Sequence, residues 1–288
     1  MPLLPPRPHR NRTEMPSRSR KGLEHLVRAP PGCALEQAHR ILGAFERSRV
    51  ANEQMTIKAL LFDFDGVIIE TETPIYRSWL ELYQSYGFDL PFDLWILTIG
   101  TSEKFFDPKE YLQKQVGHPL DWDEILPRRR AREMSLVHNQ PPLPGVLDYL
   151  KDARRLGLKN CIVSSSSRAW VKGHLERVEL LDYFDFFRNR DDVAHTKPDP
   201  ELFLSALEGL HISPHEAVVF EDSPNGILAA KRAGIFSVAI PNDLTRLLNL
   251  DQAGLLIDSL AEMPLEVLLR KIESPNLVVK SDQEWQFE

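Results

Sequence analysis

The sequence predicts an α/β protein: a parallel β-sheet core with an all-helical insertion directly after the first strand. Apart from Lys58 and Asp63, residues 57–64 form an apolar run with the length and composition of a buried parallel strand. No strand pattern is present in residues 73–142, whereas helices and strands alternate from residue 143 onwards. Such alternation implies right-handed crossovers and parallel strands.

Composition excludes several classes of protein. The chain has 288 residues, of which 42% are hydrophobic and 27% charged, as in an ordinary globular protein. No apolar run reaches the roughly 18 residues that a membrane span needs. The only cysteines, Cys33 and Cys161, exclude a disulfide framework and a cysteine-rich zinc site, and they fit a reducing compartment. We therefore expect a cytoplasmic, monomeric protein with no membrane partner.

The charge is unevenly distributed along the chain. The net charge is −7, yet residues 1–54 carry ten Arg or Lys against five Glu. The acidic remainder gives no indication of nucleic-acid binding. Residues 1–54 are rich in Pro, Arg and Ser and are predicted to be a disordered extension. One explanation is that translation begins near Met55, so that the upstream segment is not part of the protein. The other is an Arg-rich transit peptide, which the five Glu of the segment disfavour.

The segment after the first strand is predicted to form helices that start and stop at Pro and Gly signals. These helices span residues 74–86, 91–99, 106–116 and 122–137. We interpret Trp79, Trp95 and Trp122 as packing residues of this insertion. The arginines between residues 128 and 132 are interpreted as a solvated helix face, from which one arginine could reach a ligand.

The second half of the chain alternates between helix and strand. The predicted helices span residues 144–156, 169–178, 201–210, 226–233 and 265–272. The predicted strands span residues 161–163, 184–189, 217–220, 235–240 and 255–257. The tail after residue 274 is polar and is predicted to be poorly ordered.

The carboxyl end of the first strand is a candidate site. Asp63 and Asp65 are two residues apart, so their side chains point to the same side of the strand. Gly66 lets the chain turn away and leaves space above both carboxylates. Ligands of open α/β sheets bind outside the carboxyl ends of the strands.

The sequence of residues 63–71, DFDGVIIET, resembles the first motif of the haloacid dehalogenase superfamily, DxDGx(T/V). The resemblance implies that Asp63 is a nucleophile towards phosphorus and that Asp65 is a general acid and base. The helical insertion resembles the cap of the branch that includes β-phosphoglucomutase and CbbY. This implies a Rossmann-like core of residues 55–72 and 143–273, with a cap of residues 73–142.

Three further strand ends resemble the remaining motifs of this family. The resemblance implies that Ser165, or alternatively Ser164, hydrogen-bonds the phosphoryl group, and that Lys197 neutralises its charge. Glu221 and Asp222 resemble the acidic pair that binds magnesium. The implied Mg²⁺ ligands are Asp63, the backbone carbonyl of Asp65, Glu221 and Asp222. The nine histidines show no spacing typical of metal ligands.

The expected function is that of a magnesium-dependent phosphatase acting on a small phosphorylated metabolite, with a sugar phosphate favoured. A phosphomutase of the β-phosphoglucomutase type is the first alternative, and a non-catalytic phospho-ligand binder is the second. A phospho-receiver domain is disfavoured by the helical insertion. Ile75 stands where the mutase pattern has a histidine, and Glu103 where it has a cap arginine. An aliphatic side chain cannot hold the hydrogen bond of that histidine, and Glu103 would repel a phosphate unless Lys104 beside it compensates, so we expect hydrolysis rather than isomerisation.

Overall fold

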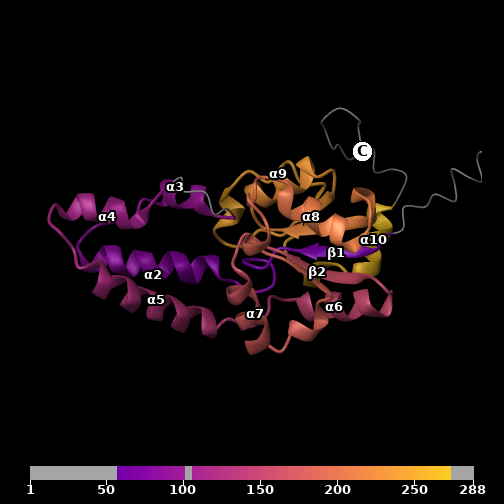
Figure 1. Cartoon of the computed structure of the whole chain (residues 1–288), viewed down its shortest axis with the longest axis horizontal. Coiled ribbons are helices and arrows are strands. Elements are labelled where there is room, and N and C mark those ends of the chain that lie inside the picture. The colour runs from indigo at the N-terminus through magenta and orange to yellow at the C-terminus, as the bar shows by residue number, and fades with distance from the viewer. Residues whose placement is uncertain (1–56, 101–105, 274–288) are drawn as a thin grey trace, which may run out of the picture. The chain divides into compact units, whose positions relative to one another are not determined.

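The computed structural model describes residues 57–100 and 106–273 (Figure 1). The expectations for the extension of residues 1–54, for the polar tail and for Glu103 lie outside the described residues. None of the helices in the described part of the chain is long and apolar enough to cross a membrane.

Six parallel strands form one sheet, in the order β3-β2-β1-β4-β5-β6. The strands are β1 (Ala59–Phe62), β2 (Lys159–Val163), β3 (Phe186–Arg188), β4 (Ala217–Glu221), β5 (Phe236–Ala239) and β6 (Leu255–Leu256). Phe62 is paired in register with Ile162 of β2 and with Phe220 of β4. The carboxyl ends of these three central strands therefore lie side by side, and the predicted parallel sheet is confirmed.

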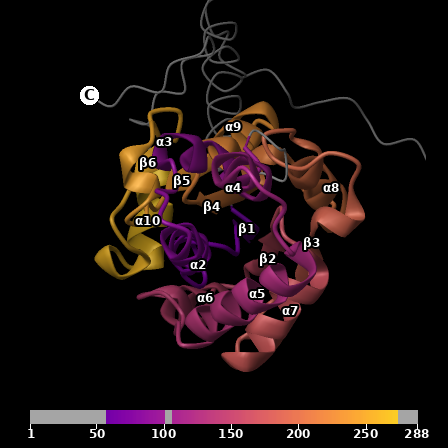
Figure 2. The same cartoon turned by 90° about the vertical axis from the view of Figure 1, so that its left-hand side faces the viewer.

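Helices cover both faces of the sheet (Figures 1 and 2). Alternate residues of β1 point to opposite faces, as the twofold side-chain period of a strand requires. Leu60 and Phe62 pack with α6 (Val146–Arg155), α7 (Arg168–Arg177) and α10 (Leu265–Ile272). Ala59 and Leu61 pack with α8 (Glu201–Leu210) and α9 (Pro224–Arg232). Cys161, on this second face, is a buried free thiol.

The insertion after β1 contains helices and no β-strand in its described residues, and its hydrophobic core cluster also includes Leu244, which follows β5. Its α-helices are α2 (Glu72–Ser85), α3 (Phe92–Trp95), α4 (Pro108–Val116) and α5 (Trp122–His138). Trp79 and Trp95 are buried in this core and Trp122 packs against it, as expected. The helix predicted from residue 91 to 99 is interrupted, because α3 ends at Trp95 and a 3-10 turn, Ile96–Thr98, follows.

Side-chain caps place two helix starts beside the carboxyl edge of the sheet. The Ser167 hydroxyl accepts a hydrogen bond from Trp170 N and so starts α7. The Ser223 hydroxyl accepts from Gly226 N and starts α9. Both caps satisfy otherwise unpaired backbone N–H groups next to the strand ends that carry the candidate site.

Candidate active site

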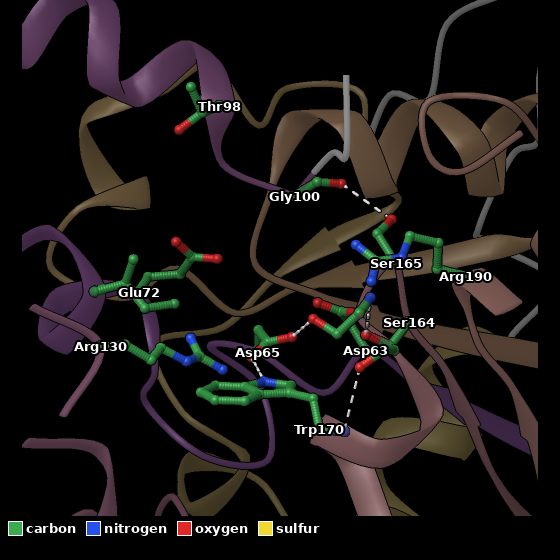
Figure 3. Close-up of a pocket in the computed structure, with 13 residues that line it drawn as sticks. Asp63, Asp65, Glu72, Thr98, Gly100, Arg130, Ser164, Ser165, Trp170 and Arg190 are labelled. Atoms are coloured by element: carbon green, nitrogen blue, oxygen red, sulfur yellow. Dashed lines mark hydrogen bonds between the residues drawn. The ribbon is translucent and has the colours of Figure 1, made fainter. Parts of the chain in front are cut away.

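A cavity of about 280 Å³ opens above the carboxyl ends of β1 and β2 (Figure 3). The core contributes Asp63, Asp65, four consecutive serines, Trp170 and Arg190 to its walls. The insertion contributes Glu72, Ile75, Thr98, Gly100 and Arg130. The cavity is therefore lined by both parts of the described structure.

Lys197 lies beneath this cavity with its side chain only 1% exposed. Its Nζ donates hydrogen bonds to Asp63 Oδ1 at 2.7 Å, to Glu221 Oε1 at 2.5 Å and to the Val163 carbonyl at 2.7 Å. All three ammonium donors are thus used. Burial works to lower the pKa of Lys197, but attraction to Asp63 and Glu221 outweighs it and raises the pKa, which favours the charged ammonium.

Asp63 is the first acidic residue after β1 and is 5% exposed. Burial raises the pKa of its carboxyl to about 8, with repulsion from Glu221 and Asp65 adding to the effect and Lys197 opposing it. One lysine therefore does not offset the negative charge gathered here. A further cation at this cluster would lower the pKa of Asp63 and favour its carboxylate form.

Asp65 is held by three donors. Its Oδ1 accepts from Thr71 Oγ1 at 2.6 Å and from Trp170 Nε1 at 2.8 Å. Its Oδ2 accepts from Ser166 Oγ. This side chain is separate from the Asp63–Lys197–Glu221 group, so the two aspartates of one strand end have different surroundings.

A metal ion fits the acidic cluster next to Asp63. Ligand oxygens of Asp63, Glu221 and Asp222 all lie within 4.8 Å of one another. Asp222 is 1% exposed, and in the described residues its carboxylate accepts from Asn242 Nδ2 at 2.8 Å but forms no ion pair. Burial and then repulsion from Glu221 and Asp63 raise the pKa of Asp222 well above its ordinary value. Burying a carboxylate without a cation costs free energy. A hard divalent cation bound by its oxygens would lower that cost.

Two glycines make room for this cluster. A Cβ on Gly66 would lie 2.2 Å from Asp222 Oδ2, and one on Gly226 would lie 1.9 Å from the Glu221 carboxyl carbon. Gly66 also has a φ of +79°, which disfavours any side chain. The backbone is therefore built to approach both carboxylates closely.

The serines after β2 all line the cavity. Ser164 is buried and its Oγ accepts from Ser166 N at 3.1 Å. Ser165 Oγ donates to the Gly100 carbonyl of the insertion at 3.4 Å, as Figure 3 shows. Both hydroxyls can face a phosphoryl group, so the choice between Ser165 and Ser164 stays open.

The arginines of α5 differ from one another. Arg128 and Arg132 are exposed and pair with Glu124 and Glu81, as expected for a solvated face. The interpretation is wrong for Arg129, whose side chain is 11% exposed and pairs with the buried Glu133. Arg130 also pairs with Glu133 and lines the cavity. The reason is that the buried Glu133 carboxylate pairs with both arginines and draws Arg129 inwards, whereas the side chain of Arg130 stays 51% exposed.

Several residues that contact the site or line it were not predicted from the sequence, among them Thr71, Ser166, Trp170, Arg190 and Asn242. Thr71 and Ser166 stood within or beside recognised motifs, so their hydroxyls were a usable signal. Trp170, Arg190 and Asn242 carried none, because each enters the site from a loop or helix distant from Asp63 in sequence. His174, one of the histidines without ligand spacing, is buried behind Trp170.

Comparison with known proteins agrees with this geometry. The family model described as haloacid dehalogenase-like hydrolase matches residues 60–240. A Bacillus subtilis protein named as a phosphatase, YhcW, is 43% identical over 220 residues, which are 76% of this chain and 100% of that protein. The Thermotoga maritima protein named phosphorylated carbohydrates phosphatase is 32% identical, covering 62% of this chain and 82% of its own.

Solved structures show the same fold. The crystal structure of CbbY from Rhodobacter sphaeroides in complex with phosphate matches with a TM-score of 0.57 and 30% sequence identity. The match covers 72% of this chain and 96% of the CbbY chain.

Proposed function

The chain belongs to the haloacid dehalogenase-like hydrolase family and is a phosphoric monoester hydrolase, and from this premise we propose that it is a magnesium-dependent phosphatase working through an aspartyl-phosphate on Asp63. One observation carries the proposal. The Asp63 carboxylate is held at the floor of the cavity by Lys197, while Asp65, two residues along, is kept apart from that ion pair by its own donors. A nucleophile and a proton donor thus stand side by side with separate partners.

The first step is attack of the Asp63 carboxylate on phosphorus, with departure of the alcohol oxygen. Lys197 offsets the repulsion between the dianionic ester and this carboxylate, because it is a buried cation bonded to Asp63 Oδ1. Asp65 gives a proton to the leaving oxygen as the P–O bond breaks. In the second step Asp65 takes a proton from water, which attacks the phosphoenzyme and releases phosphate.

Asp63 and Asp222 would hold the magnesium ion, together with the backbone carbonyl of Asp65 and with Glu221 close by. When bound, the ion supplies positive charge that favours the ionised nucleophile and a negatively charged phosphoryl group. Glu221 already bonds Lys197, so it would act mainly through the lysine, and Asp222 is the carboxylate left for the ion.

Arg190 adds a cation at the phosphoryl end of the cavity. Figure 3 shows its side chain beside Ser165, pointing into the cavity from the loop after β3. Among the described residues no carboxylate pairs with it, whereas its neighbour Asp192 pairs with Arg168. We infer that Arg190 binds the phosphoryl oxygens of the substrate.

The helical insertion would act as a cap that contacts the leaving group and selects among substrates. Asn225 Nδ2 of the core donates to the Ile99 carbonyl of the insertion at 2.8 Å, and Ser165 bonds the adjacent Gly100. These contacts join the insertion to the core beside the cavity, and we infer that the insertion limits the access of water during transfer. A sugar phosphate is the favoured substrate class, since a relative is named for phosphorylated carbohydrates.

Hydrolysis rather than isomerisation is supported by Ile75. It lines the cavity at the position where the mutase pattern carries a histidine, and an aliphatic side chain can hold no proton-relay hydrogen bond. The test supplies β-glucose 1-phosphate with a trace of β-glucose 1,6-bisphosphate and magnesium. We expect phosphate release from this or another small ester without isomerisation. Glucose 6-phosphate formed much faster than phosphate would overturn the proposal in favour of a mutase.

The enzymatic proposal itself is tested with p-nitrophenyl phosphate, with magnesium and with excess chelator. We expect phosphate release that requires magnesium. A panel of phosphorylated metabolites then identifies the preferred leaving group. Binding of these ligands without turnover of any of them would instead indicate a non-catalytic binding protein.

A further inference from the structure

Trp170 lies between the candidate general acid and the helical insertion. It is the third residue of α7, and its indole Nε1 donates to Asp65 Oδ1 at 2.8 Å. The guanidinium carbon of Arg130, on α5, lies 4.7 Å from the centroid of the indole ring. Figure 3 shows Arg130 above the ring and Asp65 at its nitrogen. One side chain therefore contacts both the acid and the insertion.

The donors around Asp65 decide which of its oxygens can carry a proton. Oδ1 accepts from the Trp170 indole, which is a donor only. Oδ1 also accepts from the Thr71 hydroxyl, so two donors already occupy this oxygen. Oδ2 bonds the Ser166 hydroxyl, which can rotate from donating to accepting. Among the described residues only Ser166, which lines the cavity, donates to Oδ2, so Oδ2 is the oxygen with a lone pair left for the transferable proton.

The indole itself is held from two sides. The His174 ring packs against it in an edge-to-face arrangement, with centroids 4.2 Å apart. On the other side Arg130 is fixed to the insertion through the buried Glu133, which also binds Arg129. Arg129 in turn bonds Ser78 Oγ of α2 at 2.9 Å. An arginine over an indole face is attracted by the ring quadrupole.

We propose that Trp170 is a positioning residue for Asp65, and that Arg130 makes this positioning depend on the insertion being seated on the core. This rests on the proposed phosphatase function. As the P–O bond breaks, the leaving oxygen keeps the electron pair and takes the proton from Asp65 Oδ2. Asp65 is left as a carboxylate with both oxygens accepting hydrogen bonds. Proton donation is then most effective when the insertion covers the substrate.

The experiment compares wild type and Trp170→Phe on aryl and alkyl phosphates with leaving groups of increasing pKa. The ratio kcat/KM reports on steps up to departure of the leaving group. Poor leaving groups need the proton and good ones do not. We expect Trp170→Phe to lose about tenfold to a hundredfold on alkyl phosphates, since it weakens general acid catalysis worth roughly 10²–10⁴-fold without removing Asp65, and to lose little on dinitrophenyl phosphate. A loss equal for all esters would overturn the positioning role.

Trp79→Phe is the matched control. Trp79 also lies under an arginine of α5, with Arg129 at 4.4 Å from its ring, but it belongs to the core of the insertion. We expect this variant to change kcat/KM evenly across the ester series. A wild-type enzyme inactive on every ester would refute the phosphatase function itself, whereas parallel losses in an active enzyme would refute the role of Trp170 alone.

Arg130→Gln tests the link to the insertion and leaves the indole in place. We expect it to steepen the same leaving-group dependence, by less than Trp170→Phe does, and Arg130→Lys to restore part of the loss. In the double variant the two effects should not add, because both act through Asp65. If Trp170→Phe does not fold, the Arg130 variants still test the proposal. A loss that is independent of the leaving group, or full additivity, would refute the coupling.

Discussion

Lys197 Nζ donates a 2.5 Å hydrogen bond to Glu221 Oε1, and both side chains are at most 1% exposed. This bond gives the two acids that end β4 different surroundings. Glu221 is bonded to a cation on one oxygen and to the Ser223 hydroxyl, at 3.1 Å, on the other. Asp222 has Asn242 as its neutral donor and no ion pair within the described structure. Adjacent acids of one motif are therefore expected to behave differently when replaced.

Asp222→Asn and Glu221→Gln should shift stability in opposite directions when magnesium is chelated. Asp222→Asn removes a buried, repelled carboxylate, so the melting temperature in chelator should rise while magnesium affinity falls at least about tenfold. Glu221→Gln takes a charge from a buried ion pair and should destabilise the protein by about 3 kcal/mol. Thermal unfolding with and without magnesium measures both. The same sign of shift for both variants in chelator would contradict this assignment.

Asp63→Asn should abolish turnover while the protein stays folded. The amide matches the carboxylate in shape, but it is not a nucleophile towards phosphorus and ligates magnesium poorly. A fall in kcat of about ten-thousandfold is the scale expected for loss of a covalent nucleophile. The measurement uses protein purified free of host phosphatases, with circular dichroism to verify folding. Substantial remaining activity would exclude Asp63 as the nucleophile.

Arg190→Gln should weaken binding of the phosphoryl group. Loss of a charge-assisted hydrogen bond corresponds to roughly tenfold to a hundredfold, which should be visible in KM and in inhibition by inorganic phosphate and by orthovanadate. The control is Arg168→Gln, since Arg168 pairs with Asp192 and does not line the cavity. Unchanged inhibition constants in Arg190→Gln, or equal changes in the two variants, would refute a role for Arg190 in binding phosphate.

His174 should make the protein sensitive to acid. Burial, followed by the charge of Arg177, lowers the pKa of His174 to about 4, with His138 and Arg130 adding and Asp65 opposing. Arg177 Nε faces His174 Nδ1 at 3.4 Å, so protonation there would place two donors together. The unfolded chain binds this proton near pH 6.5, so the neutral histidine's contribution is complete above that pH and is lost as the pH falls towards 4.

The measurement is urea denaturation of wild type and His174→Gln at pH 7.5 and pH 5. Glutamine keeps a polar side chain but does not titrate. We expect wild type to lose more stability than the variant over this interval, since the other acidic and basic groups are common to both. Equal losses would mean that His174 does not control this part of the pH dependence.

The sequence by itself determined the order of elements and the strand ends that carry chemistry. Asp63 and Asp65 follow an apolar run, and the twofold period of a strand places both side chains on one side. Because ligands of open α/β sheets bind outside the carboxyl ends of the strands, this pair was predicted to lie at a site. The alternating pattern after residue 143 predicted the parallel sheet, which the pairing of Phe62 with Ile162 and Phe220 confirms. These are local or periodic properties of the chain. The roles assigned to the site residues, and the boundaries of core and cap, stay predictions.

Only the tertiary structure decided which side chains meet. The indole of Trp170 reaches Asp65 across 105 residues of sequence, and Lys197 reaches Asp63 across 134. Nothing in the local pattern of α7 indicates that Trp170 contacts the site. The arginines of α5 look alike in sequence, and only the structure shows that Arg129 and Arg130 pair with the buried Glu133. Hydrogen bonds and ion pairs depend on the packing of segments distant in sequence, whereas periodicity reports only which face of an element is buried. For that reason the strand ends were predictable and the partners of Asp65 were not.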